Sequence, residues 1–222
     1  MPGQIILDFP EIFMGGLWLT MQISGLGLIG ALLLGIVVAL FRISPLAPLR
    51  WIGAGYVEFF RNTPLLVQLF FLFFGLPVLG IRLSQDTFVT IFWVAIIGMS
   101  LYHGAYMGEV IRGGLLGIDK GQIEAGRSLG LSYGKMLRYV QIPQAVRAVI
   151  PPLGNIAIAL VKNTSLAATI GVFELLQVAQ VVESRTFRAA EAFTAAAMLY
   201  LVLTLPLGAA VNYLERRLLV AR

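Results

Sequence analysis

Long stretches without a charged side chain most constrain the fold of this chain. Four of them cover residues 12–41, 62–81, 87–108 and 192–214, and residues 148–173 contain a single charge, Lys162. About 20 apolar residues are enough for an α-helix to cross the hydrocarbon layer of a membrane. We therefore predict an all-α membrane protein. Its five transmembrane helices are expected at about residues 13–41, 54–80, 87–108, 150–173 and 192–214.

The composition supports a lipid environment. Hydrophobic residues make up 59% of the 222 residues and charged residues 12%, against about 45–50% and about 25% in soluble domains. The net charge of +5 is scattered between the spans, which argues against a nucleic-acid partner. Cysteine is absent, which excludes disulfides and thiolate metal sites. Because Asp8 and Glu11 precede the first apolar run, we do not expect a signal peptide.

The distribution of lysine and arginine predicts the orientation. One side of the membrane would hold Arg42, Arg50, Arg112, Lys120, Arg127, Lys135, Arg138, Arg147, Arg216, Arg217 and Arg222. The other side would hold only Arg82, Arg185 and Arg188. Positive residues remain in the cytoplasm. We therefore expect the N-terminus outside, the C-terminus in the cytoplasm, and a cytoplasmic loop at about residues 112–147.

The cytoplasmic loop has the signals of a short, rigid helix. Asp119 is suited to cap its start, and Gln122 three residues later completes a capping pair. Residues 123–129 then give about two turns, and Gly130 suits the left-handed residue that ends a helix. A second helix is expected to run towards Pro143. A short helix at the base of the spans is suited to transmit force to a docked protein.

The same loop resembles the EAA loop of ABC importer permeases, in Glu124-Ala125-Gly126, Gly130 and the run Val140 to Pro143. Gly126 stands where the pattern has alanine, and we expect it to loosen the helix slightly, because glycine costs roughly 1 kcal/mol against alanine in a helix. Three further motifs cover residues 58–68, 105–113 and 162–166. Together the motifs resemble the polar-amino-acid subfamily, which imports histidine, glutamine, arginine and similar solutes, over nearly the whole chain.

The resemblance implies a single transmembrane permease domain over residues 1–222 with the type I (MetI-like) importer fold, in the bacterial plasma (inner) membrane. It also implies an assembly with two copies of an ATPase that holds ATP and Mg²⁺, an extracytoplasmic amino-acid-binding protein, and a second permease chain, identical or a sister subunit. The ATPase would dock on Ile123, Glu124, Ala125, Gly126, Arg127, Ser128, Leu129, Gly130 and Pro143.

Charged residues inside the spans are the candidates for a solute site. Lys162 follows Pro152 by ten residues, and we expect Pro151 and Pro152 to open this helix. Lys162 would then lie ~15 Å along it, about half of the hydrocarbon thickness. A cation at that depth costs about 2.5–3.5 kcal/mol or more and needs a partner or a wet cavity.

Two interpretations of these charges stay open. Glu58 and Arg61 lie on one helix face and are suited to pair, and Glu58 with Lys162 is the other possible structural ion pair. Alternatively, a mid-membrane pocket receives a zwitterion. Lys162 would face its carboxylate and Glu58 its ammonium group or a cationic side chain, with Arg61 nearby. Hydrogen bonds would come from Asn163, Thr164 and Ser165.

Nothing in the sequence indicates an enzyme. His103 is the only histidine, which excludes most catalytic triads and a histidine metal site, and we expect it to be packed. The nearest match to a phosphate-binding loop, Gly134-Lys135, lacks the first glycine and the final Ser/Thr. The chain should therefore have no cofactor of its own. A channel or carrier that works alone, and a membrane scaffold, are the alternative functions.

Two structural questions also stay open. Gly27, Ala31 and Gly35 recur every four residues, which suits close helix packing within the chain or across a dimer. Residues 174–191 form either a loop or a helix on the outer surface.

Overall fold

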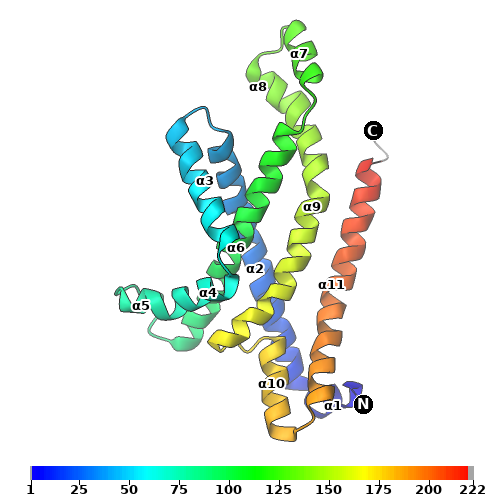
Figure 1. Ribbon diagram of the computed structural model, residues 1–222. Coiled ribbons are helices and arrows are strands. Elements are labelled where there is room, and N and C mark those ends of the chain that lie inside the picture. Colours follow the sequence, from blue (N-terminus) through cyan, green and yellow to red (C-terminus); the bar gives the residue numbers. More distant parts are fainter. Residues whose placement is uncertain (1, 220–222) are drawn as a thin grey trace.

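The computed structural model describes residues 2–219, and every regular element in this range is helical, as predicted (Figure 1). The α-helices are α1 (Pro2–Asp8), α2 (Pro10–Ile43), α3 (Ala47–Asn62), α4 (Leu65–Phe70), α5 (Leu76–Val78), α6 (Thr87–Leu116), α7 (Lys120–Ser128), α8 (Tyr133–Met136), α9 (Ile142–Asn163), α10 (Leu175–Thr186) and α11 (Ala189–Leu219). Segments η1 (Phe71–Gly75) and η2 (Leu137–Gln141) are π-helical, and η3 (Thr164–Ile170) is a 3₁₀ helix.

Four of the helices described are long and apolar enough to cross a membrane: α2, α6, α11 and the continuous helix over Gly134–Ile170. A fifth crossing is complete only if the bent pair Ala47–Asn62 and Leu65–Val78 counts as one span. The two described ends of the chain lie at different ends of the bundle, with α1 and α10 at one end and α7 and α8 at the other (Figure 1). Arg222, which contributes to the predicted orientation, lies outside the described residues.

Helices α2 and α6 pack against each other at the centre of the bundle. A Cβ at Gly27 would lie 3.1 Å from the Cβ of Met99, and a Cβ at Gly35 would lie 2.8 Å from that of Met107. Since both distances are shorter than ordinary van der Waals contact, only glycine allows this approach. The small-residue stripe of the first span therefore serves packing within the chain.

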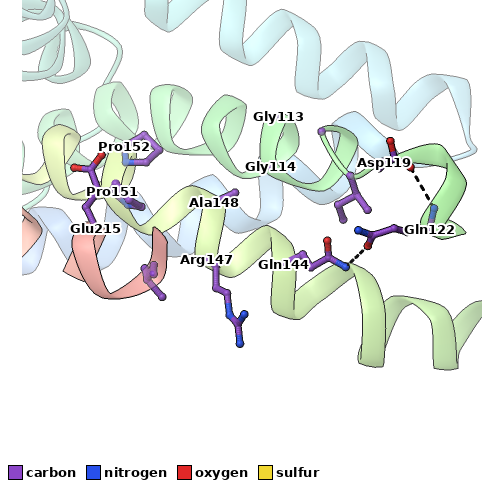
Figure 2. Close-up of a pocket in the computed structure, with 13 residues that line it drawn as sticks. Gly113, Gly114, Asp119, Gln122, Gln144, Arg147, Ala148, Pro151, Pro152 and Glu215 are labelled. Carbon is purple, nitrogen blue, oxygen red and sulfur yellow. Dashed lines mark hydrogen bonds between the residues drawn. The ribbon is translucent and has the colours of Figure 1, made fainter. Parts of the chain in front are cut away.

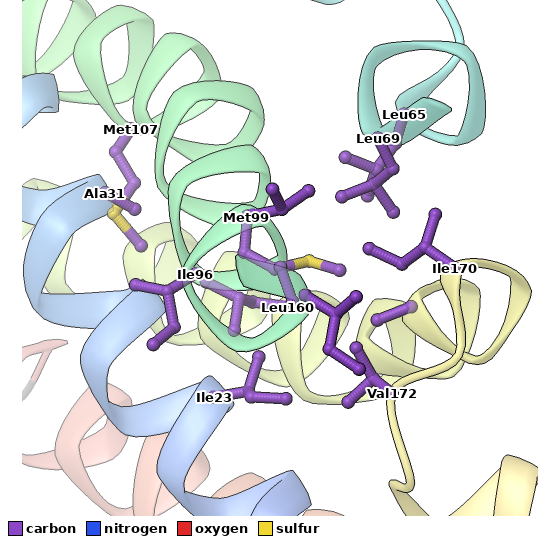
Figure 3. Packing of buried hydrophobic residues seen from close by; sticks show 14 residues of the cluster. Ile23, Ala31, Leu65, Leu69, Ile96, Met99, Met107, Leu160, Ile170 and Val172 are labelled. Atoms are coloured by element: carbon purple, nitrogen blue, oxygen red, sulfur yellow. The ribbon is translucent and has the colours of Figure 1, made fainter. Parts of the chain in front are cut away.

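The main hydrophobic core lies beside this pair (Figure 3). Met99 of α6 and Leu160 of α9 are fully buried in it, and Ile170 of η3 is almost so. Leu65 and Leu69 of α4 join the same core. Apolar packing thus holds α4 against the 3₁₀ segment that continues α9.

The second span is not the single helix predicted for residues 54–80. Its two halves, α3 and the run from α4 to α5, are bent by 104°. The break falls at Thr63, which is extended (φ −115°, ψ 141°). Pro64 causes it, because proline has no N–H to donate and disfavours the helical conformation of the residue before it.

The fourth span does not begin at Pro151 and Pro152, contrary to the prediction. Both prolines lie inside α9, which starts at Ile142 and is continuous with η2 and α8. A proline in a helix deprives the carbonyl four residues earlier of its partner. Membrane helices tolerate this where water or neighbouring groups satisfy that carbonyl. The predicted depth of Lys162 in the membrane was counted from Pro152 as the start of the helix, so it no longer holds.

Residues 174–191 are mostly helical. Helix α10 buries Leu175, Val178, Ala179 and Val182 against α2 and α11. At its end, Arg188 pairs with Asp8, 3.0 Å between Nη1 and Oδ2. The helix is thus part of the bundle, and the ion pair ties its C-terminal turn to the N-terminal segment.

Candidate functional site

Helix α7 forms as predicted, with a side-chain cap at its start. The carboxylate of Asp119 accepts hydrogen bonds from the N–H groups of Gly121 at 2.7 Å and Gln122 at 3.3 Å. The side chain of Gln122 does not complete a capping box. Its Oε1 accepts from Nε2 of Gln144 at 2.5 Å, which links α7 to α9.

Helix α7 ends in a Schellman motif around Gly130, as the glycine at this position predicts. Gly130 is left-handed with φ 74°. Its N–H donates to the carbonyl of Arg127 at 2.9 Å, and the N–H of Leu131 donates to that of Gly126 at 3.1 Å. Both ends of this short helix are therefore fixed by hydrogen bonds.

Gly126 makes room for a neighbouring side chain. It is the one buried residue of α7, and a Cβ on it would lie 2.1 Å from Cε of Met136 on α8. Met136 itself is 3% exposed. The glycine that the sequence suggests will loosen the helix thus lets α8 pack closely on α7.

Most of the predicted docking residues point to solvent. Ile123 is half-buried, and the exposed members are Glu124, Ala125, Arg127, Ser128, Leu129, Gly130 and Pro143. Leu129, an apolar side chain, is 83% exposed. Residues 117–132, which include α7, separate two long helical runs, because α6 continues to Leu116 and the run of α8, η2 and α9 starts at Tyr133. The segment between the long helices is thus shorter than the predicted loop at 112–147. It projects from the bundle as a compact knob (Figure 1).

An ion-pair network that sequence reasoning missed lies on α2 and α6, near the ends of these helices that lead to the knob. Glu109 of α6 accepts from Nε of Arg42 on α2 at 3.0 Å and from Nη2 of Arg112 at 2.8 Å. Its exposed fraction is 17%. The i, i+3 spacing of Glu109 and Arg112 was the available signal. The network joins the ends of the two central helices where α6 leads into the knob.

The predicted charges of the second span do not pair with one another. Glu58 accepts a hydrogen bond from Nδ2 of Asn62 at 2.8 Å. The guanidinium of Arg61 lies 5.2 Å from the ring centre of Tyr106, within the range of a cation–π contact. Among the described residues, neither Glu58–Arg61 nor Glu58–Lys162 forms an ion pair, so neither structural pair predicted from the sequence is present.

Gln68, another residue that sequence reasoning missed, donates hydrogen bonds across the break beside these charges. Its Nε2 donates to the carbonyls of Phe60 at 3.1 Å and Thr63 at 3.2 Å, and to the hydroxyl of Thr63 at 2.7 Å. The Phe60 carbonyl is the group that loses its helical donor at Pro64, because Pro64 lies four residues further along and has no N–H. Gln68 therefore stabilises the bend that sets the direction of α3 and its charges.

The four predicted residues at the junction of α9 and η3 do not all face the same way, because the side chains of consecutive helical residues point in different directions around the axis. Lys162 is exposed in the single chain and Ser165 half-buried. Thr164 is fully buried and donates to the Val161 carbonyl at 2.7 Å. The side chain of Asn163 points from α9 towards α6. Thr164 is therefore closed to a solute in this conformation.

Asn163 contacts the only histidine of the chain. Its Nδ2 lies 3.1 Å from Nε2 of His103, whose Nδ1 lies 3.0 Å from the carbonyl of Met99. A carbonyl only accepts, so Nδ1 carries the proton and Nε2 accepts from Asn163. His103 is 2% exposed, which confirms that it is packed and explains why Asn163 turns inward.

A cavity of about 830 Å³ opens between the ends of α6, α9 and α11 (Figure 2). Its lining includes Arg147, Ala148, Pro151, Pro152 and Glu215. The carbonyls of Arg147 and Ala148 are those that the two prolines deprive of helical donors. Arg147 and Ala148 both line the cavity, and proline inside a membrane helix is tolerated where water or a neighbouring group satisfies the freed carbonyls. In the described part of the chain, no three His, Asp or Glu side chains are placed to hold a metal ion.

Comparison with known proteins agrees with this architecture. Residues 31–220 match the family of binding-protein-dependent transport system inner membrane components. The chain is 40% identical over 214 residues to the probable glutamine ABC transporter permease protein GlnM of Bacillus subtilis, with 96% of each chain covered.

Two solved structures show the same fold. An amino acid ABC transporter crystallised with histidines superposes with a TM-score of 0.88 at 32% identity, covering 96% of both chains. The MetNI methionine transporter in an inward-facing conformation superposes with a TM-score of 0.75 at 19% identity, covering 95% of this chain and 98% of the other. The fold is thus the MetI-like fold of importer permeases, and ATP hydrolysis in such systems belongs to a separate subunit. This chain therefore belongs to the binding-protein-dependent inner membrane components, as a multi-pass permease subunit of an amino-acid ABC importer in the bacterial inner membrane.

Proposed function

We propose that this chain lines the path of an ATP-driven importer for a polar amino acid and that an ATPase moves it through α7. The observation that carries this proposal is the construction of α7. The helix is capped by Asp119, closed by Gly130 and packed on Met136, while its outer face is exposed. A rigid element with a free face is suited to receive force from a docked subunit.

The force has a path into the membrane. Helix α6 leads into α7 through a short turn, and Gln122 connects α7 to α9 through Gln144. The Glu109 network connects α6 to α2. Movement of α7 would therefore reach three of the spans together.

The solute site is proposed at the bend of the second span and the end of α9. Lys162 offers a cation for the α-carboxylate, and the Ser165 hydroxyl, which here donates to the Lys162 carbonyl, would turn to bind it. Glu58 and Arg61 lie on α3, with Arg61 over the ring of Tyr106. Asn163 and Thr164 support the site from behind, through His103 and the Val161 carbonyl. One relative is named for glutamine and a similar amino acid ABC transporter was crystallised with histidines, so a neutral or cationic polar amino acid is the proposed substrate class.

The proposed assembly contains two permease chains, this one with a copy of itself or a sister, and two ATPase subunits that bind ATP and Mg²⁺. An extracytoplasmic binding protein delivers the amino acid at the end of the bundle formed by α1 and α10. Lys162 is exposed in the single chain, and a second permease chain would enclose it.

Reconstitution in liposomes tests the proposal. Uptake of labelled glutamine, histidine or arginine should require ATP, the ATPase and the loaded binding protein together. Uptake by this chain alone would instead identify a self-sufficient channel or carrier. A complete complex that takes up none of the three amino acids would contradict the substrate class.

A further inference from the structure

His103 of α6 is buried, neutral and held in one tautomer. It is 2% exposed, and it takes part in no ion pair among the described residues. A buried charge without a partner is costly, so the imidazole is neutral. Its Nδ1 lies 3.0 Å from the carbonyl oxygen of Met99, which only accepts. The single ring proton is therefore on Nδ1, and Nε2 carries a lone pair.

This lone pair decides which way the amide of Asn163 faces. The nitrogen and the oxygen of an amide have nearly the same size, so packing alone does not separate its two orientations. Nε2 of His103 lies 3.1 Å from Nδ2 of Asn163, which donates. With the amide turned over, Oδ1 would meet the lone pair of Nε2, and the two acceptors would repel each other. Neutral His103 thus fixes the amide nitrogen inward.

The oxygen of the same amide is its uncommitted end. Asn163 is half-buried, and among the described residues no donor reaches its Oδ1. This oxygen is also not one of the buried side-chain atoms that lack a partner, so it is open at the surface of the chain. Lys162, the preceding residue, is exposed. A cation and a neutral acceptor therefore come from adjacent residues at the end of α9.

An α-amino acid carries the complementary pair of groups on one carbon atom. We propose that Oδ1 of Asn163 accepts a hydrogen bond from the α-ammonium group of the solute, and that His103 is the positioning residue that turns this oxygen towards the solute. The inference rests on the proposed function, which puts Lys162 at the α-carboxylate. Lys162 and Asn163 together then recognise the groups that all α-amino acids share, and Glu58 is left for a cationic side chain.

The first test measures direct binding to the complex of this chain with its ATPase in detergent, without the binding protein, so that only the permease site recognises the solute. The probes are labelled glutamine, histidine and arginine, each compared with the same acid without its α-amino group. In His103→Leu the amide is able to turn over. The Kd for the amino acid should rise about tenfold, the effect of losing one hydrogen bond to a charged group. The Kd for the acid without the amino group should change less than about twofold.

Further variants separate positioning from packing. In His103→Gln, the side-chain oxygen is suited to accept from Asn163 in place of Nε2, so the Kd should stay within about threefold of wild type. Asn163→Ala should lose as much affinity as His103→Leu, and the double variant should lose no more, because both changes remove one hydrogen bond. Met107→Leu is the matched control, a nearly isosteric change at a buried position of the same helix, and should bind as wild type.

The second test requires no substitution. Because the chain has a single histidine, isotope-labelled histidine in this chain, assembled with unlabelled ATPase, gives the magnetic resonance signals of one imidazole. Nδ1 should be protonated and Nε2 unprotonated. Saturating amino acid should shift the Nε2 signal through Asn163, and the acid without the amino group should leave it unchanged.

A protonated Nε2 would overturn the inference, as would a wild-type Kd in His103→Leu. So would an equal loss of affinity for the amino acid and for the acid without its amino group, or a loss in His103→Gln or Met107→Leu as large as in His103→Leu. A wild-type complex that transports with its binding protein but binds none of the three amino acids directly would overturn the inference and leave the proposed function intact. Failure of the proposed function is distinct, since the complete wild-type complex would then take up no amino acid.

Discussion

Arg42 at the end of α2 and Glu109 near the end of α6 form an ion pair, 3.0 Å between Nε and Oε1, although they are far apart in sequence. The same carboxylate binds Arg112. The close contacts of Gly27 and Gly35 hold the two helices together further along. Helices α2 and α6 thus form one unit, and the Arg42–Glu109 ion pair joins them at the end beside the knob. The first prediction concerns this carboxylate.

Glu109→Gln should destabilise the chain by about 1–3 kcal/mol, because it leaves two partly buried guanidinium groups without their anion. The expected readout is a lower unfolding midpoint in detergent. Glu183→Gln is the matched control, since no ion pair involving the Glu183 side chain occurs among the described residues. Equal midpoints for the two variants would show that the network contributes nothing to stability.

Gly130→Ala should weaken coupling, and Gly130→Asn should be tolerated. The left-handed conformation costs roughly 1–2 kcal/mol for an ordinary residue, whereas glycine and, to a lesser extent, asparagine adopt it readily. Stimulation of ATP hydrolysis by the loaded binding protein, relative to the basal rate of each variant, measures this. If the alanine variant is stimulated as well as the asparagine variant, the Schellman motif is not needed for docking.

Gly126→Ala restores the alanine of the EAA pattern, and its effect should depend on Met136. Alanine gains roughly 1 kcal/mol of helix propensity, but its Cβ would lie 2.1 Å from Cε of Met136, and overpacking costs about 1–3 kcal/mol. The single variant should be neutral or less stable. Combined with Met136→Ala, the same change should be stabilising relative to Met136→Ala alone. A double-mutant cycle of unfolding free energies measures this, and additive effects would contradict the packing argument.

The sequence predicts those parts of the molecule that local rules decide. The caps of α7 at Asp119 and Gly130 follow from the preferences of a few neighbouring residues. Membrane burial follows from the uncharged runs. Pro64 indicates a break in the second span. The hydrogen bonds that Gln68 donates to Phe60 and Thr63 cannot be predicted locally, because the side chain folds back across this break. Pro151 and Pro152 lie inside α9 and line a cavity between α6, α9 and α11 that only the folded bundle forms. The division of residues 162–165 likewise requires His103 on another helix. Tertiary contacts decide these cases, and no local pattern records them.

Single cysteines should establish the orientation of the bundle. The chain has none of its own, so each introduced thiol is the only target. Ser128→Cys, exposed on α7, should react with an impermeant maleimide only from the cytoplasmic side, and Ser184→Cys, exposed on α10, only from the outside. Labelling of intact cells and of inverted vesicles separates the two faces. The reverse pattern would place α7 out of reach of an ATPase and remove the basis of the proposed coupling.

Lys162→Met should abolish uptake while leaving the chain inserted and assembled. The exposed ammonium of Lys162 forms no ion pair among the described residues, so its loss removes a charge for the solute carboxylate and little packing. Lys162→Arg retains the cation and should preserve part of the activity, although its planar fork differs from an ammonium group. Glu58→Gln keeps an acceptor for Asn62 and should selectively weaken uptake of cationic amino acids relative to glutamine. Competition between labelled glutamine and unlabelled arginine measures this selectivity. Normal uptake by the assembled Lys162→Met complex would place the solute carboxylate elsewhere in the path. An unchanged arginine preference in Glu58→Gln would assign Glu58 to the support of α3 alone.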